Sequence, residues 1–234
     1  MTHFIIFMRK PNHMTGKYLF AIVVSFVFSL ALHAQKTLSE GTIVYDITVQ
    51  TGSKEPQLAD MFDGAKTTIY LKGSQSRTEM VSPLGTTITI LDSRNNTGAV
   101  LKEYGSQKLL IKMVREDWND NNNKYAGIVF TTENETKTIA GYLCQKAVAK
   151  LKDGSIFTVF FTKDLVTENK DYDYQFKNLP GLPLEYESSM GNLKVKYTAS
   201  KIAFDPIPVQ KFTVPLSGYR QLTYAESKSL KAGN

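Results

Sequence analysis

Glu185 and Glu187 form an acidic pair at positions i and i+2, a spacing that could serve acid-base catalysis. Residues i and i+2 of a β-strand share a face, and two carboxylates on one face can act as acid and base in glycoside hydrolysis. Acidic side chains on the solvated face of any strand have the same spacing. We therefore favour a solvated strand face over a catalytic pair. The sequence has no Gly-x-Ser-x-Gly, Ser-x-x-Lys, phosphate-loop or dinucleotide-binding pattern, so no catalytic residue is expected.

The stretch 117–123 is rich in Asp and Asn, whose side-chain oxygens are typical calcium ligands. It departs from the calcium-loop template because Asn122 replaces the turn glycine and Ile128 replaces the bidentate glutamate. The stretch 171–173 fails at the same two template positions. We therefore expect solvated turns and no metal site. Trp118 is either a cap over the edge of a sheet or a stacking platform for a ligand, and we favour the cap.

The segment 18–32 is apolar and predicts the hydrophobic part of a secretory signal. It follows three basic residues, Arg9, Lys10 and Lys17. Ala34 is the small residue expected before a cut ahead of Gln35. The segment is shorter than the roughly 20 residues that span a bilayer, so we expect a cleaved leader, 1–34, and no stable membrane anchor. An uncleaved anchor is the alternative, and Met14 is an alternative start.

Cleavage at this position would remove every histidine, because His3, His13 and His33 all precede Gln35. Without histidine the exported chain lacks the commonest general base at neutral pH and the commonest metal ligand. The leader holds three of the 28 basic residues and none of the 22 acidic ones, so the remainder carries +3. We expect a non-enzymatic protein with no cofactor, no metal and no nucleic-acid partner.

Residues 35–234 have the length of a single domain, and their apolar residues alternate with a period of two. The single Cys144 excludes an intramolecular disulfide and predicts a buried thiol. Short strands separated by turns predict a mainly β domain with an antiparallel sheet. We expect strands at 43–49, 66–71, 75–81, 86–91, 98–103, 108–114, 128–132, 138–143, 145–151, 156–162, 193–198, 202–204 and 209–214. We expect short helices at 56–62, 163–169 and 223–231, and a polar loop at 116–124.

The strand 156–162 is apolar on both faces, which means that a second layer must cover it. The cover is a helix, a barrel wall or a ligand, and in the last case Phe157 and Phe161 are candidate ligand contacts. In the short helix at 56–62, Leu58, Met61 and Phe62 form an apolar stripe. That stripe either packs on the core or acts as a lid over an apolar cavity, so these five residues are the candidate ligand-binding set.

Two stretches resemble the GLPGLI family of exported bacterial proteins. The first is Lys137-Thr-Ile-Ala-Gly-Tyr-Leu-Cys-Gln-Lys-Ala147, followed by Phe160-Phe-Thr162. The second is Asn178-Leu-Pro-Gly-Leu-Pro-Leu-Glu185, which differs from Gly-Leu-Pro-Gly-Leu-Ile-Leu-Glu at two positions. Phe160 stands where the family usually has Trp, and Gly154-Ser155 stands where it has Gly-Arg. These departures place the chain nearer a sister group of periplasmic domains that often end as Phe212-Thr-Val-Pro-Leu-Ser-Gly-Tyr219 does.

The resemblance covers about residues 40–226 and implies the fold of the lipoprotein carriers LolA and LolB. In that fold a curved antiparallel sheet forms a half-barrel, and a few short helices plug its concave face. The family supplies no catalytic residue to carry over. Physically, the prolines and glycine of 178–185 fix a rigid bend from which Leu179, Leu182 and Leu184 can pack inward.

The sequence therefore predicts a periplasmic or secreted binding protein with an apolar concave site for a lipid or acyl chain. The alternative is an envelope scaffold that binds a protein partner and whose concave face is a solid core. Inward-facing apolar residues have the same pattern in both cases, so the sequence leaves this choice, and the oligomeric state, open.

Overall fold

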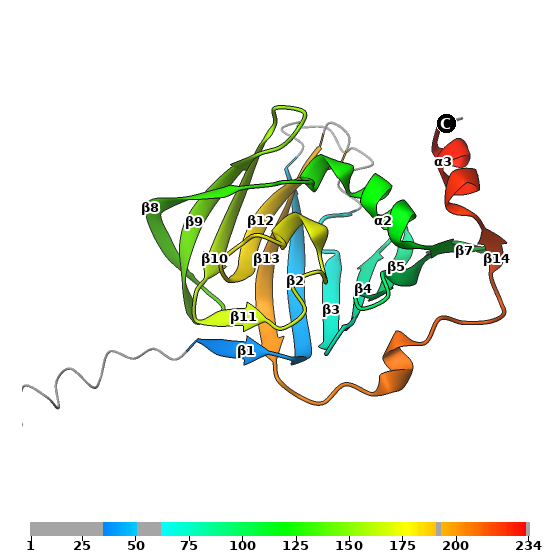
Figure 1. Ribbon diagram of the computed structural model, residues 1–234, viewed down its shortest axis with the longest axis horizontal. Helices are drawn as coiled ribbons and strands as arrows, with labels where there is room; N and C mark the ends of the chain where they lie inside the picture. Colours follow the sequence, from blue (N-terminus) through cyan, green and yellow to red (C-terminus); the bar gives the residue numbers. More distant parts are fainter. Residues whose placement is uncertain (1–34, 51–61, 191–192, 233–234) are drawn as a thin grey trace, which may run out of the picture. The chain divides into compact units, whose positions relative to one another are not determined.

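The computed structural model describes residues 35–50, 62–190 and 193–232, which belong to the compact unit Gln35–Asn234. The predicted leader, Leu58 and Met61 lie outside the described residues. Twelve strands form one open sheet in the order β14-β7-β6-β5-β4-β3-β2-β13-β12-β10-β9-β8 (Figure 1). Their bounds are β2 Glu40–Gln50, β3 Lys66–Lys72, β4 Gln75–Ser82, β5 Gly85–Asp92, β6 Thr97–Tyr104, β7 Gln107–Met113, β8 Phe130–Ile139, β9 Tyr142–Lys150, β10 Ile156–Thr162, β12 Leu182–Met190, β13 Leu193–Ala203 and β14 Arg220–Leu222.

Every neighbouring pair in this sheet is antiparallel except β14 and β7, which run parallel. The mainly β prediction is confirmed, but the sheet is mixed at one edge because a long C-terminal segment returns to β7. A second, two-stranded parallel sheet joins β1 (Lys36–Leu38) to β11 (Leu165–Thr167).

Helices are few and short among the described residues. They are α2 (Arg115–Asn121) and α3 (Tyr224–Ala232), with 3-10 turns η3 (Asn123–Tyr125), η4 (Tyr174–Phe176) and η5 (Val209–Phe212). No described helix has both the length and the apolar character needed to cross a membrane. The segment that carries β11 and η4 (yellow in Figure 1) and the helix α2 lie on one face of the sheet.

The sheet and the segment 165–184 enclose the largest core cluster. Its fully buried side chains include Tyr45, Phe161, Leu165, Leu182 and Leu184. The expectation that the leucines of 178–185 pack inward is confirmed. Gly181 is needed in this motif because a Cβ there would lie 2.0 Å from the carbonyl oxygen of Thr162.

Three predicted elements are wrong. The polar loop at 116–124 is α2 followed by η3, because the Asp117 carboxylate accepts a hydrogen bond from the Val114 amide (3.0 Å) and one helical face buries Trp118. The helix expected at 163–169 contains the strand β11 instead. The strand expected at 209–214 begins as η5, since prolines precede it and proline cannot donate to a sheet.

The strand break expected at Cys144 lies at Ala140 and Gly141 instead. Both residues have positive φ, 48° and 84°, so they form a two-residue hairpin turn between β8 and β9. An Ala-Gly pair is a weaker turn signal than Asn-Gly, which explains the misplaced boundary. The helix expected at 223–231 is confirmed as α3.

Candidate functional site

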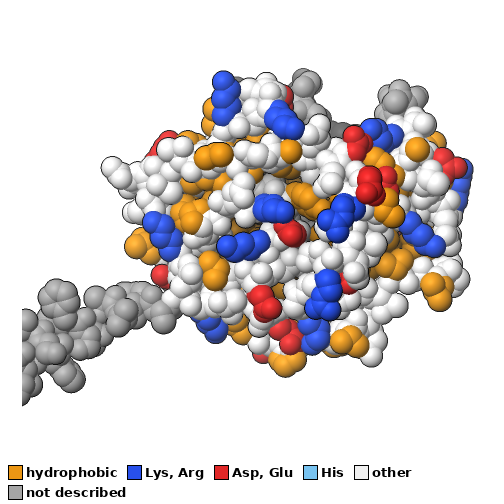
Figure 2. Space-filling model, in the orientation of Figure 1, with side chains coloured by type: hydrophobic (Ala, Val, Ile, Leu, Met, Phe, Trp, Pro, Cys, Tyr) orange, Lys and Arg blue, Asp and Glu red, His pale blue; other side chains and the backbone are white. Residues whose placement is uncertain are grey.

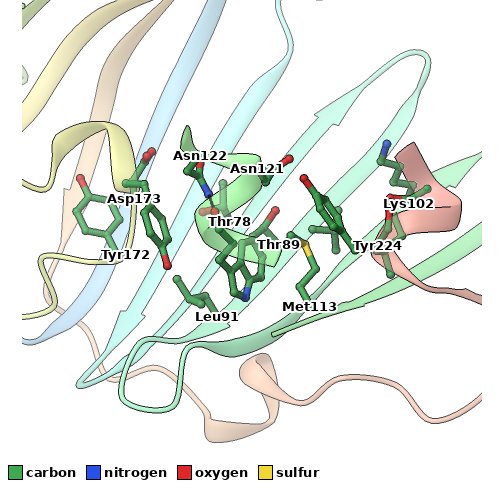
Figure 3. A pocket seen from close by; sticks show the side chains of 15 residues that line it. Thr78, Thr89, Leu91, Lys102, Met113, Asn121, Asn122, Tyr172, Asp173 and Tyr224 are labelled. Atoms are coloured by element: carbon green, nitrogen blue, oxygen red, sulfur yellow. Dashed lines mark hydrogen bonds between the residues drawn. The ribbon is translucent and has the colours of Figure 1, made fainter. Parts of the chain in front are cut away.

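A cleft of about 300 Å³ lies on the sheet beside α2 and α3 (Figure 3). Strands β4 to β7 build its floor through their register. Thr78 lies opposite Thr89, Thr89 opposite Val100, and Val100 opposite Ile111, so four strands contribute one continuous row of side chains. Leu91 and Met113 line the cleft beside this row. The floor is therefore apolar at one end of the row and carries hydroxyl groups at the other.

Trp118 of α2 covers this floor. Its side chain is only 3% exposed and packs in a cluster with Leu91, Ile111, Met113 and Leu222. The indole nitrogen Nε1 is buried and has no hydrogen-bond partner among the described residues. An unpaired buried N–H costs about 1–3 kcal/mol, which an acceptor supplied from outside would recover.

The helix α3 forms a second wall and is tied to α2 by Asp120. The Asp120 carboxylate accepts hydrogen bonds from the Tyr224 hydroxyl (2.7 Å) and from the Lys228 ammonium (2.8 Å). The hydrogen bond from Lys228 has the larger effect and that from Tyr224 the smaller, and together they hold the pKa of Asp120 below its usual range. Burial and the same carboxylate raise the pKa of Tyr224 to about 12, so its hydroxyl stays a donor.

The opposite end of the cleft contains Asp173 and Tyr172 (Figure 3). Burial raises the pKa of Asp173 to about 6, although the side chain accepts hydrogen bonds from the backbone N–H (3.1 Å) and amide side chain (2.9 Å) of Gln175. Its charge contributes to the raised pKa values of Tyr172 and Tyr186, after the larger effect of their own burial. The cleft therefore ends at a carboxylate that titrates near neutral pH.

Phe157 and Phe161, the strand residues of the predicted ligand-binding set, are core side chains. Phe157 makes ring contacts with Tyr125, Phe130, Phe176 and Tyr186 at centroid distances of 5.8–6.5 Å. Phe161 is fully buried in the same cluster. Neither residue lines the cleft beside α2. The helix expected at 56–62 lies outside the described residues except for Phe62, which is half-buried in a 3-10 turn before β3.

The second face of β10 is covered by a charged layer. The Lys137 ammonium lies 3.8 Å from the centroid of the Phe160 ring and 2.5 Å from a Glu185 carboxylate oxygen. Lys196 lies 3.3 Å from the same oxygen. Glu185 is thus held in an ion-pair cluster over an aromatic ring, and Glu187 is exposed beside it. This geometry supports the interpretation of the two glutamates as a strand face.

The described residues contain no group of three or more His, Cys, Asp or Glu side chains placed to hold a metal ion. The stretch 117–123 is mostly helical and does not form a calcium loop. Cys144 is buried, and burial raises the pKa of its thiol to about 11. Acidic, basic and apolar side chains are interspersed on the face shown in Figure 2.

No protein-family model matches the sequence, and no curated protein matches it. Among solved structures, the chain is similar to PNGF-II, at 14% identity over 82% of this chain and 33% of that one, with a TM-score of 0.48. It is also similar to MucB (12% identity, 84% and 64% covered, TM-score 0.39). An uncharacterised conserved protein from Thermus thermophilus is similar at 7% identity, with 86% and 99% covered and a TM-score of 0.44. The chain spans about a third of the PNGF-II chain, and these likenesses carry no functional argument.

The cleft beside α2 was not predicted from the sequence. Its signal was present in the alternation of 85–113, where Val100 and Lys102 share a strand face with Gly98. The favoured prediction for Trp118, a cap over a sheet edge, is confirmed, because Trp118 packs with Leu222 of the edge strand β14 and with Ile111 and Met113 of β7. Consecutive hairpins set the register that aligns β4 to β7 into one floor. This alignment cannot be recognised until the pairing of the strands is known.

Proposed function

We propose that the protein is a periplasmic, non-enzymatic binding protein whose ligand occupies the cleft beneath Trp118. The observation that carries this proposal is the combination of a partly apolar floor with a buried, unpaired indole N–H in one cleft of the described chain. Ligand sites are mostly apolar concave surfaces with a few polar groups that fix orientation. The proposed ligand is an apolar chain or ring that carries a hydrogen-bond acceptor.

The volume of the cleft restricts the size of this ligand. About 300 Å³ is the lower end of the range for small-molecule sites, so the site suits one short chain and not a two-chain lipid. Each buried CH₂ group contributes about 0.8 kcal/mol, so a chain of a few methylenes gives useful affinity before ordering costs are subtracted.

We further propose that the open sheet is a half-barrel of the lipoprotein-carrier type and that the chain is related to the GLPGLI family. Supporting this, the segment 165–181 lies on one face of the sheet, and Leu179, Leu182 and Leu184 of the motif that leads into β12 pack inward. The motif thus has a structural role, in which Gly181 lets the chain pass close to β10.

An envelope scaffold is the second candidate function. The solid aromatic packing around Phe157 and Phe161 favours it, because the predicted apolar site in that region is filled by protein side chains. The binding function requires a ligand in the cleft beneath Trp118 in the cell, whereas the scaffold function requires none.

Mass spectrometry of organic extracts tests the proposal on protein purified from the envelope under native conditions. The wild-type protein should carry a small amphiphile. Val100→Phe, which fills the middle of the floor, should be purified without it. Leu143→Phe is the matched control, because Leu143 is 64% exposed and lies outside the cleft, and it should retain the ligand. A folded wild-type protein that is empty and binds no acyl probe would favour the scaffold.

A further inference from the structure

Half-buried cations in the described part of this protein are paired with carboxylates, with one exception. Seven lysine and arginine side chains there are neither exposed nor fully buried. Six of them have an acidic partner: Lys72 with Glu40, Arg77 with Glu79, Lys137 and Lys196 with Glu185, Lys146 with Glu133 and Glu135, and Lys211 with Glu79. The seventh is Lys102, which has no carboxylate within 4 Å among the described residues. A cation drawn partly out of water without a counter-ion is energetically unfavourable.

Lys102 lines the cleft beneath Trp118. It lies on β6 two residues after Val100, so both side chains project from the same face of the sheet. Its partners across the neighbouring strands are Thr87 and Leu109, neither of which is acidic. Figure 3 places Lys102 and Asp173 at opposite ends of the cleft. Among the described residues, the cleft therefore has an unpaired positive end, a middle that combines apolar side chains with the Thr78 and Thr89 hydroxyls, and an acidic end.

We infer that Lys102 binds the anionic head group of a single-chain amphiphile whose apolar chain lies on the floor beneath Trp118. The inference rests on the proposed function and adds the charge and orientation of the ligand. The anionic group of the ligand pairs with Lys102, which has no carboxylate partner among the described residues. Its chain then contacts Val100, Ile111 and Met113 and runs toward Asp173. A second anionic group at the far end is disfavoured there, because it would face a carboxylate.

The head group is a carboxylate or a phosphate, since an ammonium group pairs with either. The volume of the cleft, about 300 Å³, restricts the chain to a limited length. A zwitterionic two-chain lipid satisfies neither the volume nor the charge of this site.

The test uses decanoate, decyl phosphate and decanol, which share one chain and differ in head group. Trp118 is the only tryptophan of the chain, so a change in its emission reports binding at this cleft. The expected result is that both anions bind at least tenfold more tightly than decanol. Lys102→Met, which nearly keeps the length of the side chain, should weaken both anions about tenfold, or ~1.4 kcal/mol, and leave decanol within twofold. Lys112→Met is the matched control, because Lys112 is exposed on β7 and does not line the cleft.

The possible results separate the inference from the proposed function. Anions and decanol that bind equally well, with Lys102→Met affecting neither, would overturn the role of Lys102 and leave the binding function standing. If no amphiphile changes Trp118 emission, both fail. Stronger binding of only one anion identifies the head group and supports the inference. Decanol binding by Lys102→Met shows that this variant is folded.

Discussion

Asp173 is a partly buried residue whose carboxyl pKa is raised by desolvation. Burial raises the pKa of its carboxyl to about 6 from an ordinary value of 3.8. Between about pH 4 and pH 6 the folded protein holds a proton that the unfolded chain has released. Stability therefore falls as the pH rises through this window and is constant above it.

Asp173→Asn should remove this pH dependence. Asparagine keeps an oxygen acceptor for the Gln175 amide but carries no charge to desolvate. Relative to wild type, the free energy of unfolding of the variant should rise by about 2 kcal/mol between pH 4 and pH 7, a value reduced for the partial exposure of the side chain. Urea titrations at a series of pH values measure this difference. Parallel curves for the two proteins would show that the carboxyl is not desolvated.

Phe157→Leu tests whether the aromatic cluster is core or ligand site. Leucine removes the ring contacts with Phe176 and Tyr186 but keeps an apolar side chain. We expect a loss of about 1–2 kcal/mol in the free energy of unfolding, with unchanged amphiphile affinity reported by Trp118. A reduced affinity in a variant of near-native stability would restore Phe157 to the ligand-binding set.

The sequence predicted which residues are buried. It did not predict which residues surround the cleft. The pattern of 156–162 correctly indicated a strand covered on both faces, but the covers are an aromatic cluster and a Lys137–Glu185 pair. Lys137 and Glu185 are 48 positions apart, and nothing local to either residue indicates the contact. Nothing in the sequence indicates Lys102 either. What sets this residue apart is that it has no acidic partner among the described residues, and that is visible only in the structure.

At the scale of elements, α2 is the helix that holds Trp118 in place. Seven residues are too few for a stable isolated helix, so its position depends on capping and packing. Asp117 supplies the cap through its bond to the Val114 amide. The proposed binding site therefore depends on a local feature outside the sheet.

Asp117→Ala should loosen α2 and expose Trp118. Loss of a cap costs about 1 kcal/mol. The emission of Trp118 should shift to longer wavelength, and amphiphile affinity should fall. Asn119→Ala is the control, because this side chain is exposed in the same helix and should change neither quantity. An unshifted spectrum in Asp117→Ala would show that packing alone holds the helix.

The hairpins β3–β4 and β5–β6 were predictable because each alternates cleanly and is closed by a turn rich in Gly, Ser or Asn. The errors occur where long-range contacts overrule local preference. The strand β11 exists only because β1 lies beside it, and α2 forms in an Asn-rich stretch because the sheet buries one tryptophan. The parallel return of β14 to β7 follows a segment of 16 residues after β13 whose path no local pattern specifies.

At the scale of the whole molecule, the account requires export and cleavage of the leader. N-terminal sequencing of protein recovered from the periplasmic fraction should give a chain that begins at Gln35. Replacing Ala34 with Phe should block cleavage, because the peptidase requires a small residue at that position. A mature form that retains 18–32 in the membrane would contradict both the localisation and the absence of histidine from the working protein.

Quenching of Trp118 by a brominated decanoate is the most direct test of the central claim, that an amphiphile lies beneath this side chain. Bromine quenches tryptophan emission on contact, and the single tryptophan makes the signal specific to the cleft. The account predicts saturable quenching by the brominated chain, competition by unbrominated decanoate, and loss of quenching in Val100→Phe. Emission that falls only linearly with concentration, with no saturation and no competition, would contradict it.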